Sequence, residues 1–175
     1  MSFSNIRNLF IFERYIFIME YRVEVLEEYF LVGKSLSMSI LENKTALLWK
    51  GFMPELKKIK NIISEDLFSV EVYPTDYFNE FVPQKSFEKW AAVAVGSFDE
   101  LPADIKQLRV PEGKYAVFNY KGKSSEAFKL YQYIYGEWLS LSGNSLDNRP
   151  HFAVMGEKYK NDDPSSEEEI WIPIK

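Results

Sequence analysis

The chain contains no cysteine and a single histidine among its 175 residues. The absence of cysteine excludes disulfide bonds, thiol nucleophiles, iron–sulfur clusters and cysteine-ligated zinc. His151 is then the only candidate base for a histidine-dependent triad, and no Gly-x-Ser-x-Gly motif supplies a nucleophile for it. It follows Arg149-Pro150, so we interpret it as a structural residue beside a turn.

Long apolar runs are also scarce, and the 26 acidic residues outnumber the 21 basic ones. The longest uncharged apolar run near the N-terminus, residues 15–19, is far shorter than the ~20 residues of a membrane span, and no signal-peptide pattern is present. We expect residues 1–18 to be an N-terminal extension: a packed helix, a product of a start codon upstream of Met19, or a membrane-associating amphipathic segment. We expect a cytoplasmic protein without membrane partners. The net charge of −5 argues against direct nucleic-acid binding.

Aromatic residues are abundant. They make up 17% of the chain, with 14 Phe, 11 Tyr and 4 Trp. The hydrophobic content of 46% and the charged content of 27% are typical of globular proteins. A chain of this length buries roughly 70% of its unfolded surface, so residues 19–175 are expected to form one domain without covalent staples.

Two kinds of hydrophobic periodicity alternate along this domain. Alternating apolar residues predict strands at residues 21–39, 67–73, 90–95, 113–122, 151–155 and 168–174. Helical spacing predicts a helix over about 42–63, which Pro54 should kink or split. A second helix is predicted from Ser124 to about Ser142, ending before Gly143.

The order strand–helix–strand–strand therefore occurs twice, in residues of about 19–100 and 101–175. Aligning Glu71 with Ala153 gives an offset of 82 residues, and aligning Trp90 with Glu169 gives 79. These similar offsets favour a tandem duplication. The predicted fold is α+β: duplicated βαββ units with helices on an antiparallel sheet and a central groove between the halves.

Several segments resemble one family. LRVPEGKYAVFNYKG at 108–122, FEKWAAV at 87–93, YIYGEWL at 133–139 and the tail at 149–175 are similar to the GyrI-like effector-binding domains, also called AraC-type or integron-associated. The resemblance runs over 19–175 and implies a tandem βαββ domain that binds lipophilic, often cationic, drugs in an aromatic groove. Relatives attach it to a DNA-binding helix-turn-helix; we expect a stand-alone bacterial member.

The chain departs from the family pattern at two positions. Many relatives have Phe-Glu-x-x-Gly-Glu-Lys-Tyr where residues 152–159 read Phe-Ala-Val-Met-Gly-Glu-Lys-Tyr, so the pocket glutamate implied by the resemblance is Ala153. Relatives also often carry Glu in the strand that holds Ala94. Because a buried carboxylate draws a cation into an aromatic pocket, we predict a ligand more neutral or more apolar than the family's usual cations.

The candidate site combines aromatic side chains with a few acids. Trp90 shares a strand face with Ala92 and Ala94, as Trp171 does with Glu169, and these faces either line the groove or pack under the helices. Glu71 either supplies the acid that the second half lacks or is a solvated strand carboxylate. Tyr115 and Phe118 point to opposite sides of their strand, so one of them faces away. The candidate ligand-binding residues are Trp49, Glu71, Tyr73, Trp90, Tyr115, Phe118, Tyr131, Trp138, Phe152, Glu169 and Trp171.

The sequence thus predicts a non-enzymatic effector-binding protein, active in transcriptional regulation, multidrug binding or drug sequestration. No cofactor, metal or catalytic residue is predicted, and the acidic run at 162–169 is interpreted as a solvated hairpin rather than a calcium loop. Two alternatives remain open: a hydrolase of small strained xenobiotics using the same groove, and a protein-interaction role such as DNA gyrase modulation. The partner would be a small molecule and, in the last case, a regulator or gyrase; the protein would be a monomer or a dimer.

Overall fold

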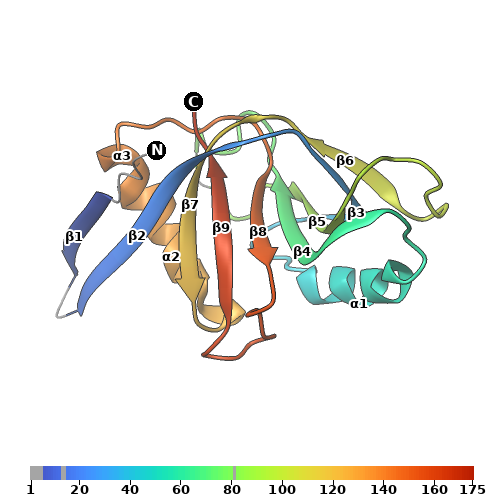
Figure 1. Ribbon diagram of the computed structural model, residues 1–175. Helices are drawn as coiled ribbons and strands as arrows, with labels where there is room; N and C mark the ends of the chain where they lie inside the picture. Colours follow the sequence, from blue (N-terminus) through green and yellow to red (C-terminus); the bar gives the residue numbers. More distant parts are fainter. Residues whose placement is uncertain (1–5, 13–14, 81) are drawn as a thin grey trace.

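The computed structural model describes the backbone of residues 6–12, 15–80 and 82–175, and the side chains of residues 20–80 and 82–175 (Figure 1). The strands are β1 (Ile6–Phe12), β2 (Tyr15–Leu26), β3 (Tyr29–Met38), β4 (Ile62–Val72), β5 (Phe87–Val95), β6 (Lys106–Val110), β7 (Gly113–Lys121), β8 (His151–Met155) and β9 (Glu167–Pro173). The helical segments are α1 (Thr45–Leu56), η1 (Ser124–Glu126), α2 (Phe128–Tyr133), η2 (Ile134–Trp138) and α3 (Leu139–Leu141).

The strands of the described residues form one antiparallel sheet of nine strands, in the order β1-β2-β7-β9-β8-β4-β5-β3-β6. The units β3–α1–β4–β5 and β7–α2–β8–β9 fill its two halves, and they meet where β4 pairs with β8. The predicted α+β fold of tandem βαββ units is therefore confirmed.

The two halves join through the β4–β8 ladder. In this ladder Ser69 lies opposite Ala153, and Glu71 lies opposite His151. The offset between the two halves stays a prediction from the sequence.

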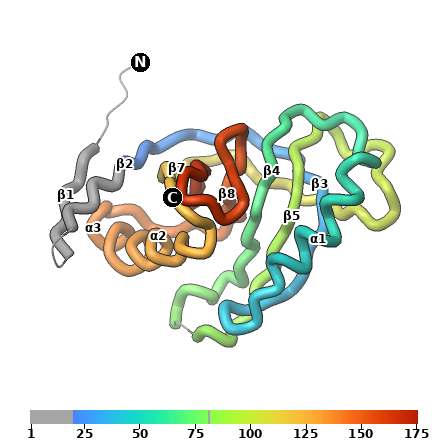
Figure 2. Tube along the Cα trace, turned by 90° about the horizontal axis from the view of Figure 1, so that it is seen from below, coloured from blue at the N-terminus to red at the C-terminus, as the bar shows by residue number. Residues whose placement is uncertain are grey.

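The two faces of the sheet carry different cores. Cross-strand pairing places Phe118, Ile170, Ala153, Ser69 and Ala91 in one row across five strands. The outer parts of this face are covered by the helices: α1 packs on Val32 and Val93 among others, and α2 with η2 packs on Phe118 and Ile170. Figure 2 shows the two helices over opposite halves.

The opposite face holds a third core made mainly of aromatic and β-branched side chains. Its buried members are Leu31, Phe68, Val70, Trp90, Ala92, Ala94, Val110, Tyr115, Val117, Phe152 and Trp171. Trp90, Ala92 and Ala94 share this face, as the alternation predicted. None of the described residues forms a helix long and apolar enough to cross a membrane.

Two local predictions are wrong. Residues 6–12 pair with 15–21 as strands β1 and β2, so the N-terminal segment is not a helical extension, and β2 continues through Met19 without a break. Helix α1 ends at Leu56, two residues after Pro54, and Ile62 and Ile63 belong to β4 instead. Proline clashes with the preceding helical turn and lacks an N–H, which favours termination of the helix rather than a kink.

Strand β3 must contain glycine at residue 33. It lies between Ala92 of β5 and Lys106 of β6, and a Cβ atom there would overlap the carbonyl oxygen of Ala91. We expect Gly33→Ala to lower the free energy of unfolding by about 2 kcal/mol or more, because the overlapping atoms are backbone and cannot rotate away. Urea unfolding followed by circular dichroism measures this change.

Gly51→Ala is the matched control. Gly51 lies in α1 with open space around the position of a Cβ, so alanine should stabilise by about 0.5–1 kcal/mol. Equal effects of the two substitutions would contradict the packing explanation.

Candidate functional site

A buried ion pair lies in the middle of the helix-covered face. Glu71 of β4 and Lys89 of β5 are direct cross-strand neighbours, and their side chains form an ion pair in which each is 11% exposed. On the other side of Glu71, the strand partner is His151 of β8, which is 3% exposed. Charged side chains are rarely this buried and persist only when they are paired, so this row is the most unusual polar feature of the sheet.

Three tyrosines lie within electrostatic reach of Glu71. Burial raises the pKa of Tyr73, Tyr131 and Tyr135 well above the usual range, and the charge of Glu71 acts in the same direction on all three. These phenols therefore stay protonated and can donate hydrogen bonds. Because phenol rings combine a flat apolar face with one donor, they suit the recognition of an aromatic molecule.

His151 connects this cluster to the loop after β4. Its Nδ1 shares a hydrogen bond of 2.9 Å with the hydroxyl of Tyr135, and Phe78 stacks on its ring at 5.5 Å. Burial lowers the pKa of His151 to about 3, so the imidazole is neutral near pH 7. It acts here as a neutral hydrogen-bonding partner and not as a source of charge.

A second carboxylate approaches the pair from β9. Burial raises the pKa of Glu168, the ammonium of Lys89 opposes this rise, and the charge of Glu71 adds to it. The same carboxylate also contributes to the raised pKa of Tyr131. The ammonium of Lys89 therefore acts on two acids: it forms an ion pair with Glu71, and it partly offsets the raised pKa of Glu168.

The helix that carries two of these tyrosines is irregular. Tyr131 lies in α2, and Tyr135 lies in η2, a π-helical turn over Ile134–Trp138. Their rings stack at 6.2 Å with planes 13° apart. Short π-helical turns occur mostly at functional sites, where they re-aim a side chain without ending the helix.

A cavity of about 200 Å³ adjoins the cluster. Tyr73, Phe78 and His151 line it on the cluster side, and Asp147 and Arg149 are among the polar residues on the other. Pockets for drug-sized ligands measure roughly 300–1,000 Å³. A ligand of that size would therefore need the cavity to extend by displacing tyrosine or lysine side chains of the cluster.

The opposite face has a cavity of its own, of about 190 Å³. Phe152 and Trp171 stack in its wall at 5.5 Å with planes 15° apart, and Trp171 Nε1 donates a hydrogen bond of 3.1 Å to Glu169. Arg22 Nη2 pairs with the same carboxylate at 2.7 Å. Two acids line this cavity: Glu169 is paired with a cation, and Asp66 accepts a hydrogen bond from Ser64.

The sheet divides the candidate residues between its two sides. Trp49, Glu71, Tyr73, Phe118, Tyr131 and Trp138 belong to the helix-covered side, whereas Trp90, Tyr115, Phe152, Glu169 and Trp171 belong to the other. Tyr115 and Phe118 face opposite sides, as alternation predicted. Phe118 and Trp138 contact each other edge-on in the core under η2, at 5.0 Å between ring centroids.

Sequence reasoning missed Lys89, Tyr135 and Glu168. Lys89 is the one cation in the otherwise apolar inward face of β5, and Tyr135 follows Tyr131 at helical i,i+4 spacing. Both patterns can be recognised in the sequence. Glu168 lies in an acidic run, a pattern typical of solvated residues, but it is partly buried in the folded chain, where it pairs across strands with Tyr120 of β7.

Ala153 also lies on the helix-covered side, packed with Ile134 and Ile170 and opposite Ser69. The position at which the family resemblance implies a pocket glutamate therefore lies under η2, in the strand next to the one that carries Glu71. Among the described residues, no group of three potential metal ligands gathers there or elsewhere.

Comparisons with known proteins agree with this architecture. A family model described as "Cass2: Integron-associated effector binding protein" matches residues 31–174. The transcriptional regulator BrlR of Pseudomonas aeruginosa is 28% identical over 93 residues, which are 53% of this chain and 34% of the regulator. The match thus spans about a third of the length of that relative.

Solved structures show the same fold at low identity. The C-terminal domain of EcmrR aligns with a TM-score of 0.68 at 16% identity, covering 91% of this chain and 99% of that domain. SAV2435 bound to tetraphenylphosphonium aligns at 0.63 and 16% identity, covering 90% and 94%. A hydrolase encoded by lin2189 of Listeria innocua aligns at 0.51 and 12%, covering 89% and 91%.

The buried imidazole makes stability depend on pH. The pKa of His151 is about 3 in the folded chain and near 6.5 when it is exposed, so between these values the unfolded chain binds a proton that the folded chain does not. Its contribution is complete above pH 6.5 and is lost as the pH falls. We expect the free energy of unfolding to fall by about 1.4 kcal/mol per pH unit below 6.5.

Urea titrations between pH 7.5 and 5 measure this slope, and His151→Gln provides the comparison because the chain has no other histidine. The variant should lose most of the slope in this window, even though it is less stable at pH 7. A variant with the slope of the unmodified chain would show that another group titrates.

Proposed function

Because the chain belongs to the family of integron-associated effector binding proteins, we propose that it binds a lipophilic aromatic effector at the cluster around Glu71 and Lys89. The observation that carries this proposal is the buried ion pair, whose carboxylate acts electrostatically on Tyr73, Tyr131 and Tyr135. Burial of ionisable groups with shifted pKa values beside a cavity is typical of a functional site.

Affinity in such a site comes mainly from apolar area. Each Å² of apolar ligand surface removed from water contributes about 25 cal/mol, and ring stacking adds about 0.5–1.5 kcal/mol per pair. Ser69, Ala91 and Ala153 form a row of small side chains across three neighbouring strands on this face. Because these side chains are small, a flat ring could lie over them once the tyrosines move aside. The protonated phenols then orient the ligand by donating hydrogen bonds.

The charge of the site favours an uncharged effector. Ala153 supplies no carboxylate, the charge of Glu71 is matched by Lys89, and the raised pKa of Glu168 brings that acid closer to its neutral form. The carboxylate of Glu71 is thus not free to receive a cationic ligand. This supports the prediction, made from Ala153 and Ala94, of a ligand more neutral than a lipophilic cation.

We further propose that ligand binding, rather than catalysis, is the activity of the domain, and that it acts in the cytoplasm in transcriptional control or in sequestration of the compound. The match to BrlR and the fold shared with the C-terminal domain of EcmrR support the regulatory role. Binding between the helices would reach a protein partner through the position of α2 and η2, which carry two of the tyrosines.

A hydrolase is the second candidate. The fold shared with a Listeria innocua hydrolase, together with a carboxyl of raised pKa within electrostatic reach of Tyr131, favours it. In that reaction Glu168 would act as a general acid. Product formation from small strained cyclic compounds, abolished by Glu168→Gln, would support this candidate. Stabilisation by a compound that is recovered unchanged would support the effector-binding role.

The location of the site is testable with one neutral probe, 1-naphthol. At a concentration 100 times its dissociation constant, a ligand stabilises the folded chain by about 2.7 kcal/mol, which a thermal-shift measurement detects. We expect Tyr135→Ala to weaken binding of 1-naphthol at least about tenfold in calorimetry, a loss of about 1.4 kcal/mol, because a stacking face is removed.

Tyr29→Ala is the matched control, since Tyr29 lines the cavity on the opposite face. It should leave the affinity for 1-naphthol unchanged. Loss of affinity in Tyr29→Ala but not in Tyr135→Ala would move the ligand to the other cavity and overturn the proposed site.

A further inference from the structure

The buried pair differs from the other lysine–glutamate pairs of the sheet. Lys121 and Glu167 are also cross-strand neighbours, on β7 and β9, but their side chains are 67% and 37% exposed. Lys89 and Glu71 are each 11% exposed. An exposed ion pair of this kind contributes little to the free energy of folding. A buried pair leaves an unpaired buried charge when one partner is removed, and this charge strongly destabilises the fold.

The surroundings of Glu71 are those of a cation site. Glu71 is buried opposite His151, whose ring contacts Tyr73 edge-on and shares a hydrogen bond with the hydroxyl of Tyr135. The charge of Glu71 contributes to the raised pKa values of Tyr73, Tyr131 and Tyr135. Aromatic faces and a desolvated carboxylate together attract a positive charge. Here the positive charge comes from the chain itself, through the ammonium of Lys89.

We propose that Lys89 is the specificity-determining residue of this site: its ammonium takes the place that the charge of a cationic ligand would occupy, and so turns a cation-binding cluster into one that selects uncharged aromatic molecules. The proposal rests on the effector site argued above. It concerns the charge of the ligand, and it makes Lys89 a built-in competitor of any lipophilic cation.

The competition favours the tethered group. Lys89 is anchored on the strand next to Glu71, so its effective concentration at the carboxylate is on the order of millimolar or higher, and a free cation must exceed this to displace it. A neutral ring has no such competitor. Replacing Lys89 by a shorter residue removes the competitor and opens space beside Glu71. The Glu71 carboxylate is then left without its ion-pair partner, and a cationic ligand can take the place of the lost ammonium.

The test compares three probes of matched size: 4-phenylbutylammonium, 4-phenylbutanol and 4-phenylbutyrate. We expect Lys89→Ala to bind 4-phenylbutylammonium at least tenfold more tightly than the unmodified chain in calorimetry. Its affinity for 4-phenylbutanol should change less than threefold, and that for 4-phenylbutyrate should fall. An equal gain for all three probes would overturn the proposal, because it would show only that space was created.

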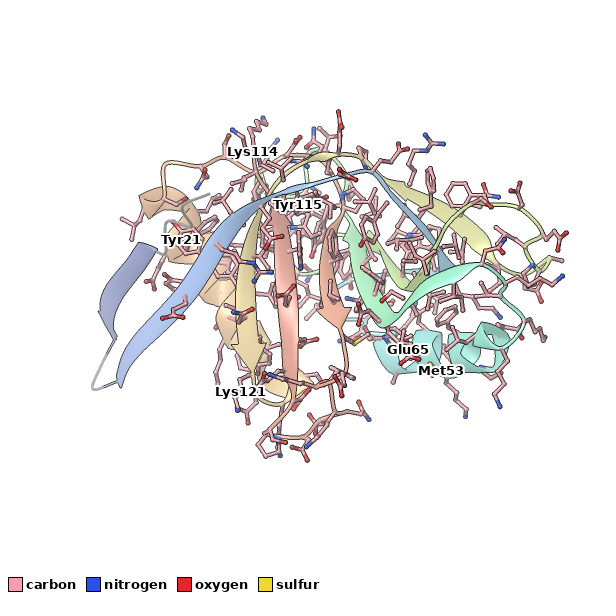
Figure 3. The ribbon with its side chains drawn as sticks, viewed as in Figure 1. Tyr21, Met53, Glu65, Lys114, Tyr115 and Lys121 are labelled. Atoms are coloured by element: carbon pink, nitrogen blue, oxygen red, sulfur yellow. The ribbon has the colours of Figure 1, made fainter. Side chains whose placement is uncertain are left out.

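Two further variants separate charge from position. Lys121→Ala removes the same charge from an exposed pair at the end of β7, labelled in Figure 3, and should bind all three probes as the unmodified chain does. Combining Glu71→Gln with Lys89→Ala should abolish the gain for 4-phenylbutylammonium. A gain that persists in this double variant, or that appears in Lys121→Ala, would refute the role of the pair.

A mirror experiment covers the case in which Lys89→Ala does not fold. Glu71→Gln keeps the lysine and leaves its ammonium without a partner, so this variant should bind 4-phenylbutyrate at least tenfold more tightly than the unmodified chain. No gain there would overturn the proposal. A failure of the proposed effector site would be seen separately, because Tyr29→Ala rather than Tyr135→Ala would then lose affinity for 1-naphthol. The comparisons with the three phenylbutyl probes measure only how each variant changes the charge preference relative to the unmodified chain.

Discussion

The pairing of β4 with β8 is the constraint on which the rest of the structure depends. It joins the two βαββ units through one antiparallel ladder centred on Ser69 and Ala153, so that a single sheet crosses the whole domain. Each unit covers its half of one face with its own helix. The strands at the junction carry small residues, like Ser69 and Ala153, and polar residues that are mutually paired, like Glu71 and Lys89.

The polar residues at this junction need bonding partners. Polar groups that are buried in a sheet face cost free energy unless they are bonded. The chain uses a cross-strand ion pair, a neutral imidazole and tyrosines from the neighbouring helix and loop. Such an arrangement is less optimised for stability than an apolar core would be. The ligand recognition proposed for this cluster would account for the charge and hydroxyl groups kept at this position.

The two faces of the sheet give the aromatic residues two distinct roles. On the side away from the helices, Trp90, Tyr115 and Phe152 pack among branched side chains as a core, and Trp171 marks the edge of a small cavity in which Arg22 pairs with Glu169. On the helix-covered side, the tyrosines lie within electrostatic reach of Glu71. The aromatic residues are thus divided between an apolar core and a polar cluster, and composition alone does not separate the two.

The sequence by itself determined the α+β class, the duplicated order of elements, the strand at 151–155 and the opposite facing of Tyr115 and Phe118, because these follow from periodicities of two or 3.6 residues within one segment. Only the tertiary structure decided the register between the halves, the strand character of the N-terminal segment, and the separation of Glu71 from Glu169 onto opposite faces. The pairing of Lys89 with Glu71 also depended on it. These features depend on contacts between segments distant in sequence, and alternation within a strand leaves both its partner and a shift of two residues undetermined.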